Sequence, residues 1–181
     1  MKGTSKTLVS STDNIYLIGM MGSGKTVTGK ALAGFLDYEF VDLDSEIQKH
    51  EERSIPEIFA TSGEAYFRDA ESSALEQASK KKYQVIATGG GIVLREENVR
   101  RMKMTGKVVL LKASAQSLWQ RVRYSRDRPL LNKPDPFGAL EQILNDRAGF
   151  YEKACHLSVS TDGKIADDVA GEIREMLRTQ V

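Results

Sequence analysis

Gly19-Met-Met-Gly-Ser-Gly-Lys-Thr26 is the stretch that decides the fold of this chain. It fits the pattern G-x-x-x-x-G-K-[ST] of a phosphate-binding P-loop. Residues 15–18 before it are apolar and rich in strand formers, and residues 26–36 after it place apolar side chains on one side of a helix. The glycines let backbone N–H groups turn toward phosphate oxygens, and the helix N-terminus adds partial positive charge. We therefore predict that a buried strand, this loop and a helix together bind the phosphates of a nucleotide.

Two side chains of the loop have roles expected from its chemistry. The ammonium group of Lys25 would reach the β- and γ-phosphates, and the hydroxyl of Thr26 would be a ligand of Mg²⁺. Mg²⁺ is therefore the expected cofactor, with the nucleotide as co-substrate.

The composition is that of an ordinary globular protein. Of 181 residues, 40% are hydrophobic and 28% are charged, which suits a single domain over 1–181. Basic and acidic residues nearly balance, 26 against 25, so charge gives no reason to expect binding to nucleic acid or to a membrane. The single cysteine, Cys155, excludes an internal disulfide and a cysteine-based metal cluster.

The N-terminal residues 1–13 are polar and lack the apolar centre of a signal peptide. No apolar run approaches the ~20 residues that span a bilayer. We predict a loose N-terminal tail over 1–13, a cytoplasmic location and, from the balanced charge, a monomer.

Acidic residues end the next predicted strand. Residues 39–44 have the composition of a short strand whose last positions include Asp42 and Asp44. Ligands of open α/β sheets bind beyond the carboxyl ends of strands, and side chains two positions apart on an extended chain point the same way. One division assigns Asp42 to the metal shell and Asp44 to the phosphoryl acceptor. The alternative is that the acids cap the following helix.

A helical pattern then covers residues 45–82, with interruptions near Pro56 and Gly63. It is too long for a plain crossover helix, so we predict an acceptor-binding subdomain. Arg68 lies within it and can hold a carboxylate through two hydrogen bonds, or simply face solvent.

Three consecutive glycines, Gly89, Gly90 and Gly91, follow a third predicted strand over 84–88. Glycines at a strand end let a ligand approach the backbone, although they also suit a flexible turn. The apolar strand directly before them favours a binding site.

Residues 123–136 are basic, contain three prolines and show no periodicity. Arg121, Arg123, Arg126 and Arg128 lie at the start of this region or just before it. Irregular segments of this length are often lids, and lid arginines can neutralise phosphate charge in the transition state. The alternative is a solvated charged loop.

The rest of the pattern completes an α/β fold. Helices are expected over 95–104, 114–122, 137–154 and 165–178, and strands over 108–111 and 157–161, with Gly106 as a helix stop. Trp119 is expected to serve packing. The alternation of strands and helices predicts a parallel sheet covered on both faces, a three-layer α/β/α arrangement.

Taken together, these residues resemble the shikimate kinase family, small P-loop kinases of aromatic amino acid biosynthesis. The resemblance covers the chain from about Asn14 onward and rests on motifs in a fixed order. They are the P-loop Gly19–Thr26, Asp42-Leu-Asp44, Gly63-Glu-x-x-Phe-Arg68, Gly89-Gly-Gly91, Arg128-Pro-Leu-Leu131, and Arg147 four residues before Tyr151. Each except the first is weak alone, and their order and spacing are specific.

The resemblance implies a five-stranded parallel sheet of order 2-3-1-4-5 and transfer of the ATP γ-phosphate to the 3-hydroxyl of shikimate. Implied roles follow by matching position. The ATP site would comprise Gly22, Ser23, Gly24, Lys25, Thr26, Val27, Arg121, Arg128 and Lys164. The shikimate site would comprise Asp44, Arg68, Gly89, Gly90, Gly91 and Arg147. Thr26 and Asp42 would form the metal shell, and Lys25, Asp44 and Arg128 would be catalytic.

One position departs from the family pattern. A hydroxyl residue usually follows the position of Thr26, where this chain has Val27. A side-chain contact to the α-phosphate is therefore missing, and we expect at most a modest loss of nucleotide affinity.

Three other functions are open at this point. Asn132-Lys-Pro-Asp135 matches N-K-x-D, the guanine-binding motif of GTPase switches, but it follows an arginine-rich loop instead of an apolar strand. A sibling kinase of gluconate or of a nucleoside monophosphate has the same P-loop. A catalytically inactive relative that binds a partner is a further alternative.

Overall fold

The computed structural model describes residues 13–125 and 128–179. The strands are β1 Asn14–Ile18, β2 Glu39–Asp42, β3 Gln84–Ala87, β4 Gly106–Lys112 and β5 Leu157–Ser160. The α-helices are α1 Lys25–Leu36, α2 Leu43–Glu51, α3 Ile55–Ser79, α4 Glu96–Thr105, α5 Ala115–Val122, α6 Pro136–Ala154 and α7 Ala166–Thr179. Two 3₁₀ turns, η1 Ile92–Leu94 and η2 Pro129–Leu131, complete the described part of the chain. Residues 1–12 of the predicted tail, and Arg126 of the arginine-rich segment, lie outside the described residues.

The five strands form one parallel sheet in the order β2-β3-β1-β4-β5, which confirms the predicted fold class. β1 lies in the centre, with Leu17 opposite Ala87 of β3 and Val109 of β4. The P-loop that follows β1 therefore lies at the middle of the carboxyl edge of the sheet, where ligands of such folds bind.

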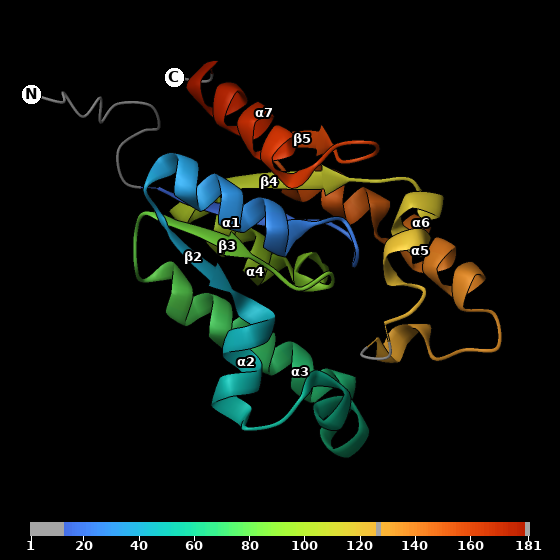
Figure 1. The fold of residues 1–181 in the computed structure, drawn as a ribbon. Coiled ribbons are helices and arrows are strands. Elements are labelled where there is room, and N and C mark those ends of the chain that lie inside the picture. Colours follow the sequence, from blue (N-terminus) through green and yellow to red (C-terminus); the bar gives the residue numbers. More distant parts are fainter. Residues whose placement is uncertain (1–12, 126–127, 180–181) are drawn as a thin grey trace, which may run out of the picture.

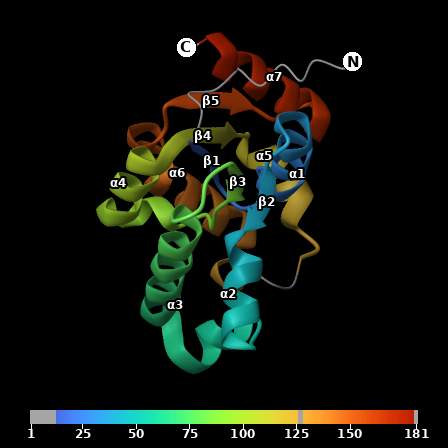
Figure 2. The ribbon, with the colours of Figure 1, turned by 90° about the vertical axis from the view of Figure 1, so that its left-hand side faces the viewer.

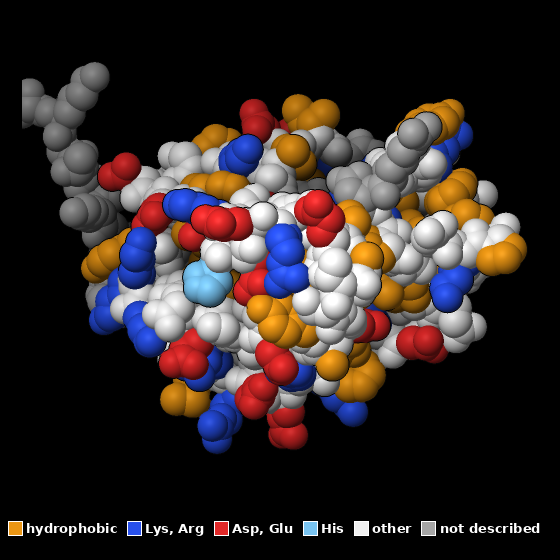
Figure 3. Space-filling view, turned by 90° about the horizontal axis from the view of Figure 1, so that it is seen from below, with side chains coloured by type: hydrophobic (Ala, Val, Ile, Leu, Met, Phe, Trp, Pro, Cys, Tyr) orange, Lys and Arg blue, Asp and Glu red, His pale blue; other side chains and the backbone are white. Residues whose placement is uncertain are grey.

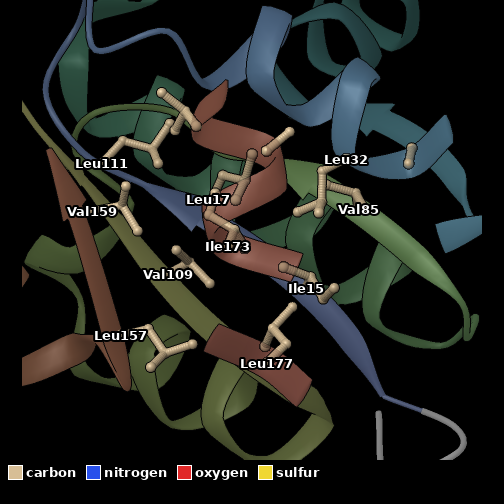
Figure 4. Close-up of a cluster of buried hydrophobic side chains, with 13 residues drawn as sticks. Ile15, Leu17, Leu32, Val85, Val109, Leu111, Leu157, Val159, Ile173 and Leu177 are labelled. Carbon is tan, nitrogen blue, oxygen red and sulfur yellow. The ribbon is translucent and has the colours of Figure 1, made fainter. Parts of the chain in front are cut away.

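Helices cover both faces of this sheet (Figure 1). Alternate β1 residues point to opposite faces, as a strand requires. Ile15 and Leu17 pack with α1 and α7, whereas Tyr16 and Ile18 pack with side chains of α3, α4 and α6. Figure 4 shows the first cluster, in which Leu32 of α1 and Ile173 of α7 approach the strand side chains.

Helices α2 and α3 extend away from the sheet as a side-by-side pair (Figure 2). The predicted interruptions occur in this excursion. Residues 52–54 separate the two helices just before Pro56, and Ser54 caps α3 through Glu57. Gly63 interrupts α3 with φ 82° and ψ 171°, a backbone conformation that suits glycine because it has no Cβ. On the face seen from below, acidic and basic side chains are interspersed (Figure 3).

The boundary between β2 and α2 corrects one prediction. The strand ends at Asp42, and Leu43 already begins the helix, so Asp44 lies in the first helical turn and not on an extended chain. The backbone N–H of Ser45 donates to Asp42 Oδ1 at 3.2 Å, so Asp42 caps α2. Helix capping, the alternative for these acids, is therefore correct for Asp42.

One other boundary differs from expectation, and the N-K-x-D match lies where the sequence predicted. Gly106 begins β4 with an extended backbone, so the strand is longer than 108–111. Asp135 caps α6 by accepting from Gly138 N–H at 3.0 Å, so the N-K-x-D match belongs to a helix start and does not follow a strand. Trp119 packs edge-on against Phe137, with ring centroids 6.0 Å apart, as its packing role predicts.

Among residues 13–125 and 128–179, no helix combines the length and apolar character needed to cross a membrane.

Candidate active site

The P-loop connects β1 to α1 through three glycines with positive φ, at Gly19, Gly22 and Gly24. Helix α5 packs closely on this loop, since a Cβ on Gly22 would lie 2.7 Å from Val122 Cγ1. Glycine at this position thus satisfies both a backbone conformation and a close contact.

Lys25 lies at the start of α1 and folds back over the loop. Its ammonium group donates to the carbonyl oxygens of Gly19, at 2.8 Å, and Met20, at 3.0 Å. Burial lowers the pKa of Lys25 to about 8, an effect that Asp44 partly opposes and Arg128 reinforces. The loop therefore holds a cation that is desolvated and available to a phosphate.

Thr26 and Asp42 form the predicted metal pair. The Thr26 hydroxyl donates to Asp42 Oδ2 at 2.8 Å, which joins the first turn of α1 to the end of β2. A hydroxyl and a carboxylate are hard oxygen donors of the kind that Mg²⁺ prefers, so these two side chains fit the ion.

Asp44 extends from the first turn of α2 toward the glycine turn after β3. A Cβ on Gly89 would lie 3.2 Å from Asp44 Oδ1, and this oxygen has no hydrogen-bond partner among the described residues. Burial raises the pKa of Asp44, and the negative charge of Asp42 adds to this effect. A buried acceptor oxygen without a partner is costly unless a ligand satisfies it.

Arg68 is held by two carboxylates of α3. Its Nη1 donates to Glu71 at 2.9 Å and its Nη2 donates to Glu64, also at 2.9 Å. A Cβ on Gly91 would collide with the Arg68 guanidinium group, so glycine at this position lets the arginine lie against the backbone. Burial raises the pKa of Glu71, while Arg68 opposes the increase.

Arg147 of α6 reaches the same turn from the other side. It is buried, and its Nη1 would lie 3.6 Å from a Cβ on Gly90. One helical turn further on, the Tyr151 hydroxyl donates to the carbonyl oxygen of Gly90 at 2.5 Å. The glycine turn is thus enclosed by Arg68 from α3 and by Arg147 and Tyr151 from α6.

These side chains meet around a cavity of about 80 Å³. Its lining includes the predicted shikimate residues Asp44, Arg68, Gly89, Gly90, Gly91 and Arg147, with Arg128 of the predicted lid. Apolar side chains complete the wall, among them Phe59 and Phe67. A cavity of this size is smaller than the roughly 300 Å³ typical of ligand pockets, so a ligand requires it to open.

The opening lies on the lid side. A second hollow of about 610 Å³ shares Phe59, Arg128 and Pro129 with the small cavity and extends to Trp119. Arg128 and Pro129 of the predicted lid therefore line both hollows. Arg128 Nε is buried and has no hydrogen-bond partner among the described residues.

The remaining predicted ATP residues lie around the P-loop or after β5. Arg121 of α5 donates to Gly22 O at 3.1 Å and to Thr161 O at 2.9 Å, which joins the loop to the end of β5. Lys164 follows β5 and forms an ion pair with Glu172 of α7. Ser23 is fully buried in the loop, and Val27 of α1 is exposed.

A larger hollow of about 920 Å³ lies elsewhere, along the edge strand β2 between α2 and α3. Asp42 is the one predicted site residue in its lining. Carboxylates at its rim are paired within the protein, as Glu51 is with Arg53 and Asp69 with Arg95. We therefore place the active site at the P-loop and the small cavity, where the chemically distinctive side chains converge.

Sequence reasoning did not identify Glu71, nor did it give Tyr151 a role. Glu71 is 1% exposed, although it lies among other acids of a helix and has no motif of its own. A signal was present in both cases, since Glu71 is three residues after Arg68 and Tyr151 is four after Arg147. These spacings place each pair on one face of a helix.

Comparison with known proteins agrees with this geometry. The family model described as "Shikimate kinase" matches residues 21–178. The shikimate kinase of Thermodesulfovibrio yellowstonii is 42% identical over 160 residues, which are 88% of this chain and 92% of that protein. The shikimate kinase of Symbiobacterium thermophilum is 42% identical over 167 residues, 91% of this chain and 96% of the other.

Solved structures extend the comparison to the whole fold. A shikimate kinase from Acinetobacter baumannii, in complex with shikimate, is 35% identical and superposes with a TM-score of 0.92 over 97% of this chain and 96% of that one. A gluconokinase from Sinorhizobium meliloti has a TM-score of 0.57 at 18% identity over 93% of each chain, and shares the fold alone. With the P-loop, the glycine turn and both buried arginines in place, and with relatives this similar over nearly their full length, the chain belongs to the shikimate kinase family.

Proposed function

We propose that this chain transfers the γ-phosphate of ATP to the 3-hydroxyl of shikimate, giving shikimate 3-phosphate and ADP. The observation that carries the proposal is the convergence of Asp44, Arg68, Arg147 and the glycine turn on one cavity beside Lys25. Two arginines suit a carboxylate, and one carboxylate suits hydroxyl groups. Shikimate has both kinds of group.

In this proposal, the acceptor carboxylate lies between Arg68 and Arg147 and against the N–H groups of residues 89–91. Glu71 keeps Arg68 in place through the buried ion pair. The unpartnered oxygen of Asp44 accepts a hydrogen bond from the reacting hydroxyl. Asp44 first orients this hydroxyl, and its raised pKa suits it to take the proton as well.

The phosphoryl donor occupies the P-loop. Lys25 leaves the carbonyl oxygens of Gly19 and Met20 to bind the β- and γ-phosphates, and Arg128 closes from the lid over the transferred group. Thr26 directly, and Asp42 through water in the family pattern, would hold Mg²⁺, which neutralises phosphate charge when bound. Phosphoryl transfer depends on alignment and charge neutralisation more than on covalent chemistry of the protein.

The same proposal assigns a role to each segment of the single domain. The excursion over 45–82 binds the acceptor, residues 123–136 act as the lid, and Arg121 and Lys164 lie near the adenine. We propose that the protein acts as a monomer in the cytoplasm. Light scattering of the purified protein measures its molar mass and so tests the oligomeric state.

The test is a coupled ADP-release assay with ATP, Mg²⁺ and a panel of acceptors: shikimate, quinate, gluconate and nucleoside monophosphates. Wild type runs beside Asp44→Asn and Arg68→Ala. The matched controls are Asp168→Asn in the exposed first turn of α7 and Arg95→Ala, whose side chain pairs with Asp69 away from the cavity. We expect turnover on shikimate in wild type and both controls, with loss in both site variants.

Other outcomes separate the alternatives. Turnover on gluconate or a nucleoside monophosphate alone would keep the kinase fold and overturn the acceptor. Strong preference for GTP without need of an acceptor would favour a switch. ATP binding without turnover on any acceptor would favour the partner-binding alternative.

A further inference from the structure

Tyr151 occupies an unusual position for a tyrosine hydroxyl, in the middle of the charged side chains that enclose the glycine turn. The residue is 3% exposed, and its hydroxyl donates to Gly90 O at 2.5 Å. The charges of Arg147, Glu71 and Arg68 act on the same hydroxyl. Burial raises its pKa to about 12, so the hydroxyl keeps its proton and remains a donor at physiological pH.

The glycine turn needs such a contact because it has no side chains of its own. Within the turn, Ile92 N–H donates to Gly89 O at 3.3 Å and Leu94 N–H donates to Gly91 O at 3.0 Å. These local bonds shape the turn and do not connect it to another element. The Tyr151 hydroxyl connects the middle carbonyl to α6, across 61 residues of sequence.

Arg147 and Tyr151 lie four residues apart on α6, so they share one face of that helix. Any shift of α6 relative to the turn would move Arg147 away from Gly90, whose Cβ position lies 3.6 Å from Arg147 Nη1. A hydrogen bond from Tyr151 to Gly90 limits that shift. The Tyr151 hydroxyl therefore fixes the position of the Arg147 guanidinium group relative to the glycine turn.

We propose that Tyr151 is a positioning residue for the acceptor, holding the Gly89–Gly91 turn and Arg147 at the spacing that one carboxylate requires. This inference rests on the proposed function, since it concerns the carboxylate end of the same acceptor site. Tyr151 itself is not part of the lining of the small cavity. Its loss should weaken acceptor binding and leave the chemical step unchanged.

The matched control is Tyr16, a second buried tyrosine with a hydroxyl in a hydrogen bond. Tyr16 is fully buried in β1, and its hydroxyl lies 2.7 Å from Thr105 Oγ1, away from the glycine turn. Replacing either tyrosine with phenylalanine removes one buried hydroxyl and leaves a partner without its bond. A purely structural role would give the two variants the same phenotype.

The experiment measures steady-state kinetics of Tyr151→Phe and Tyr16→Phe with shikimate and ATP, after thermal melting shows that both are folded. We expect the KM for shikimate to rise about tenfold in Tyr151→Phe, the effect of one lost hydrogen bond. Its kcat and its KM for ATP should stay within about twofold of wild type, and Tyr16→Phe should match wild type in all three. An unchanged KM for shikimate, or an equal change in Tyr16→Phe, would overturn the inference.

A double-mutant cycle adds a readout that does not depend on one variant. Tyr151→Phe and Arg147→Lys should raise the KM for shikimate by less together than the product of their separate effects, because both act on one carboxylate contact. If the increase in the KM for shikimate in the double variant equals the product of the two single increases, the proposal is contradicted. Wild-type turnover on shikimate with an unchanged KM in Tyr151→Phe removes this inference alone. Absence of wild-type turnover on shikimate removes the proposed function and this inference with it.

Discussion

Arg68 and Glu71 form an ion pair at 2.9 Å, one turn apart on α3, with side chains that are only 10% and 1% exposed. A Cβ on Gly89 would collide with Glu71 Oε1, so this pair lies directly beneath the glycine turn. The pair thereby connects the excursion α2–α3 to the carboxyl edge of the sheet. Without Glu71, the buried Arg68 would retain Glu64, whose side chain is 49% exposed, and would lose its buried counter-charge.

Glu71→Ala should therefore lower the free energy of unfolding by about 3 kcal/mol, as expected when one partner of a buried pair is removed. Urea denaturation measures the change. The control is Glu76→Ala, whose carboxylate pairs with Lys80 at 3.5 Å on the surface and should cost less than about 1 kcal/mol. Equal costs for the two variants would show that burial of the first pair does not matter.

Asp44→Asn should gain stability while it loses activity. Because the raised pKa of Asp44 lets the folded protein bind a proton that the unfolded chain releases near pH 4, wild-type stability falls as pH rises from about 4 through the raised pKa. Asparagine does not titrate, so the melting temperature of the variant should exceed that of wild type by an amount that grows as the pH rises from about 4 through the raised pKa of Asp44. We expect kcat to fall at least about a hundredfold. A difference in melting temperature that stays flat with pH would contradict this account.

Lys25 should take up a proton when ATP binds. Its pKa of about 8 in the free protein means that only part of the population carries the charge near that pH, and a bound triphosphate favours the charged form. Titration calorimetry in two buffers of different ionisation enthalpy should show net proton uptake near pH 8 and much less near pH 6.5. The prediction fails if uptake is the same at both values.

Gly91→Ala should impair the acceptor site through contact alone. The added methyl would meet the Arg68 guanidinium group, which must move, and we expect the KM for shikimate to rise about tenfold or more. The matched control is Gly171→Ala in α7, where a Cβ meets no atom within 4 Å. Alanine there should stabilise the protein by about 0.5–1 kcal/mol without a kinetic effect.

Val27→Thr should change the KM for ATP by no more than about threefold, since it adds one exposed hydroxyl and keeps the backbone N–H of the loop. Val27 is 58% exposed, so the substitution should leave the free energy of unfolding within about 0.5 kcal/mol of wild type. Equilibrium titration with ATP measures affinity directly. A tenfold increase in ATP affinity in Val27→Thr would show that the missing hydroxyl contact contributes substantially to nucleotide binding.

Sequence patterns predicted the loop and a parallel sheet because both depend on local constraints, whereas the strand order followed from the resemblance to the shikimate kinase family. Gly22 needs a positive φ whatever surrounds it, and strand alternation around Leu17 follows from its own neighbours. Asp44 was placed in the wrong element because Leu43 suits a strand as well as a helix, and the cap formed by Asp42 decides between them. The site assignments of the ligand-binding residues stay predictions.

The residues that sequence reasoning missed depend on tertiary contacts. Glu71 resembles any helix carboxylate until the turn after β3 covers it. The hydroxyl of Tyr151 acquires a role only when α6 lies beside Gly90. Burial of a polar group is a property of the assembled fold, and no spacing in the chain encodes it on its own.

The direct passage of β2 into α2 links the two substrates thermodynamically. Asp42 accepts a hydrogen bond from the Thr26 hydroxyl beside the P-loop, and Asp44, two residues later, lines the small cavity, where the charge of Asp42 raises its pKa. A cation bound at Asp42 would screen that repulsion and favour the ionised Asp44 that a hydroxyl donor prefers. Metal-nucleotide and acceptor should therefore raise each other's affinity, and by reciprocity the two factors must be equal.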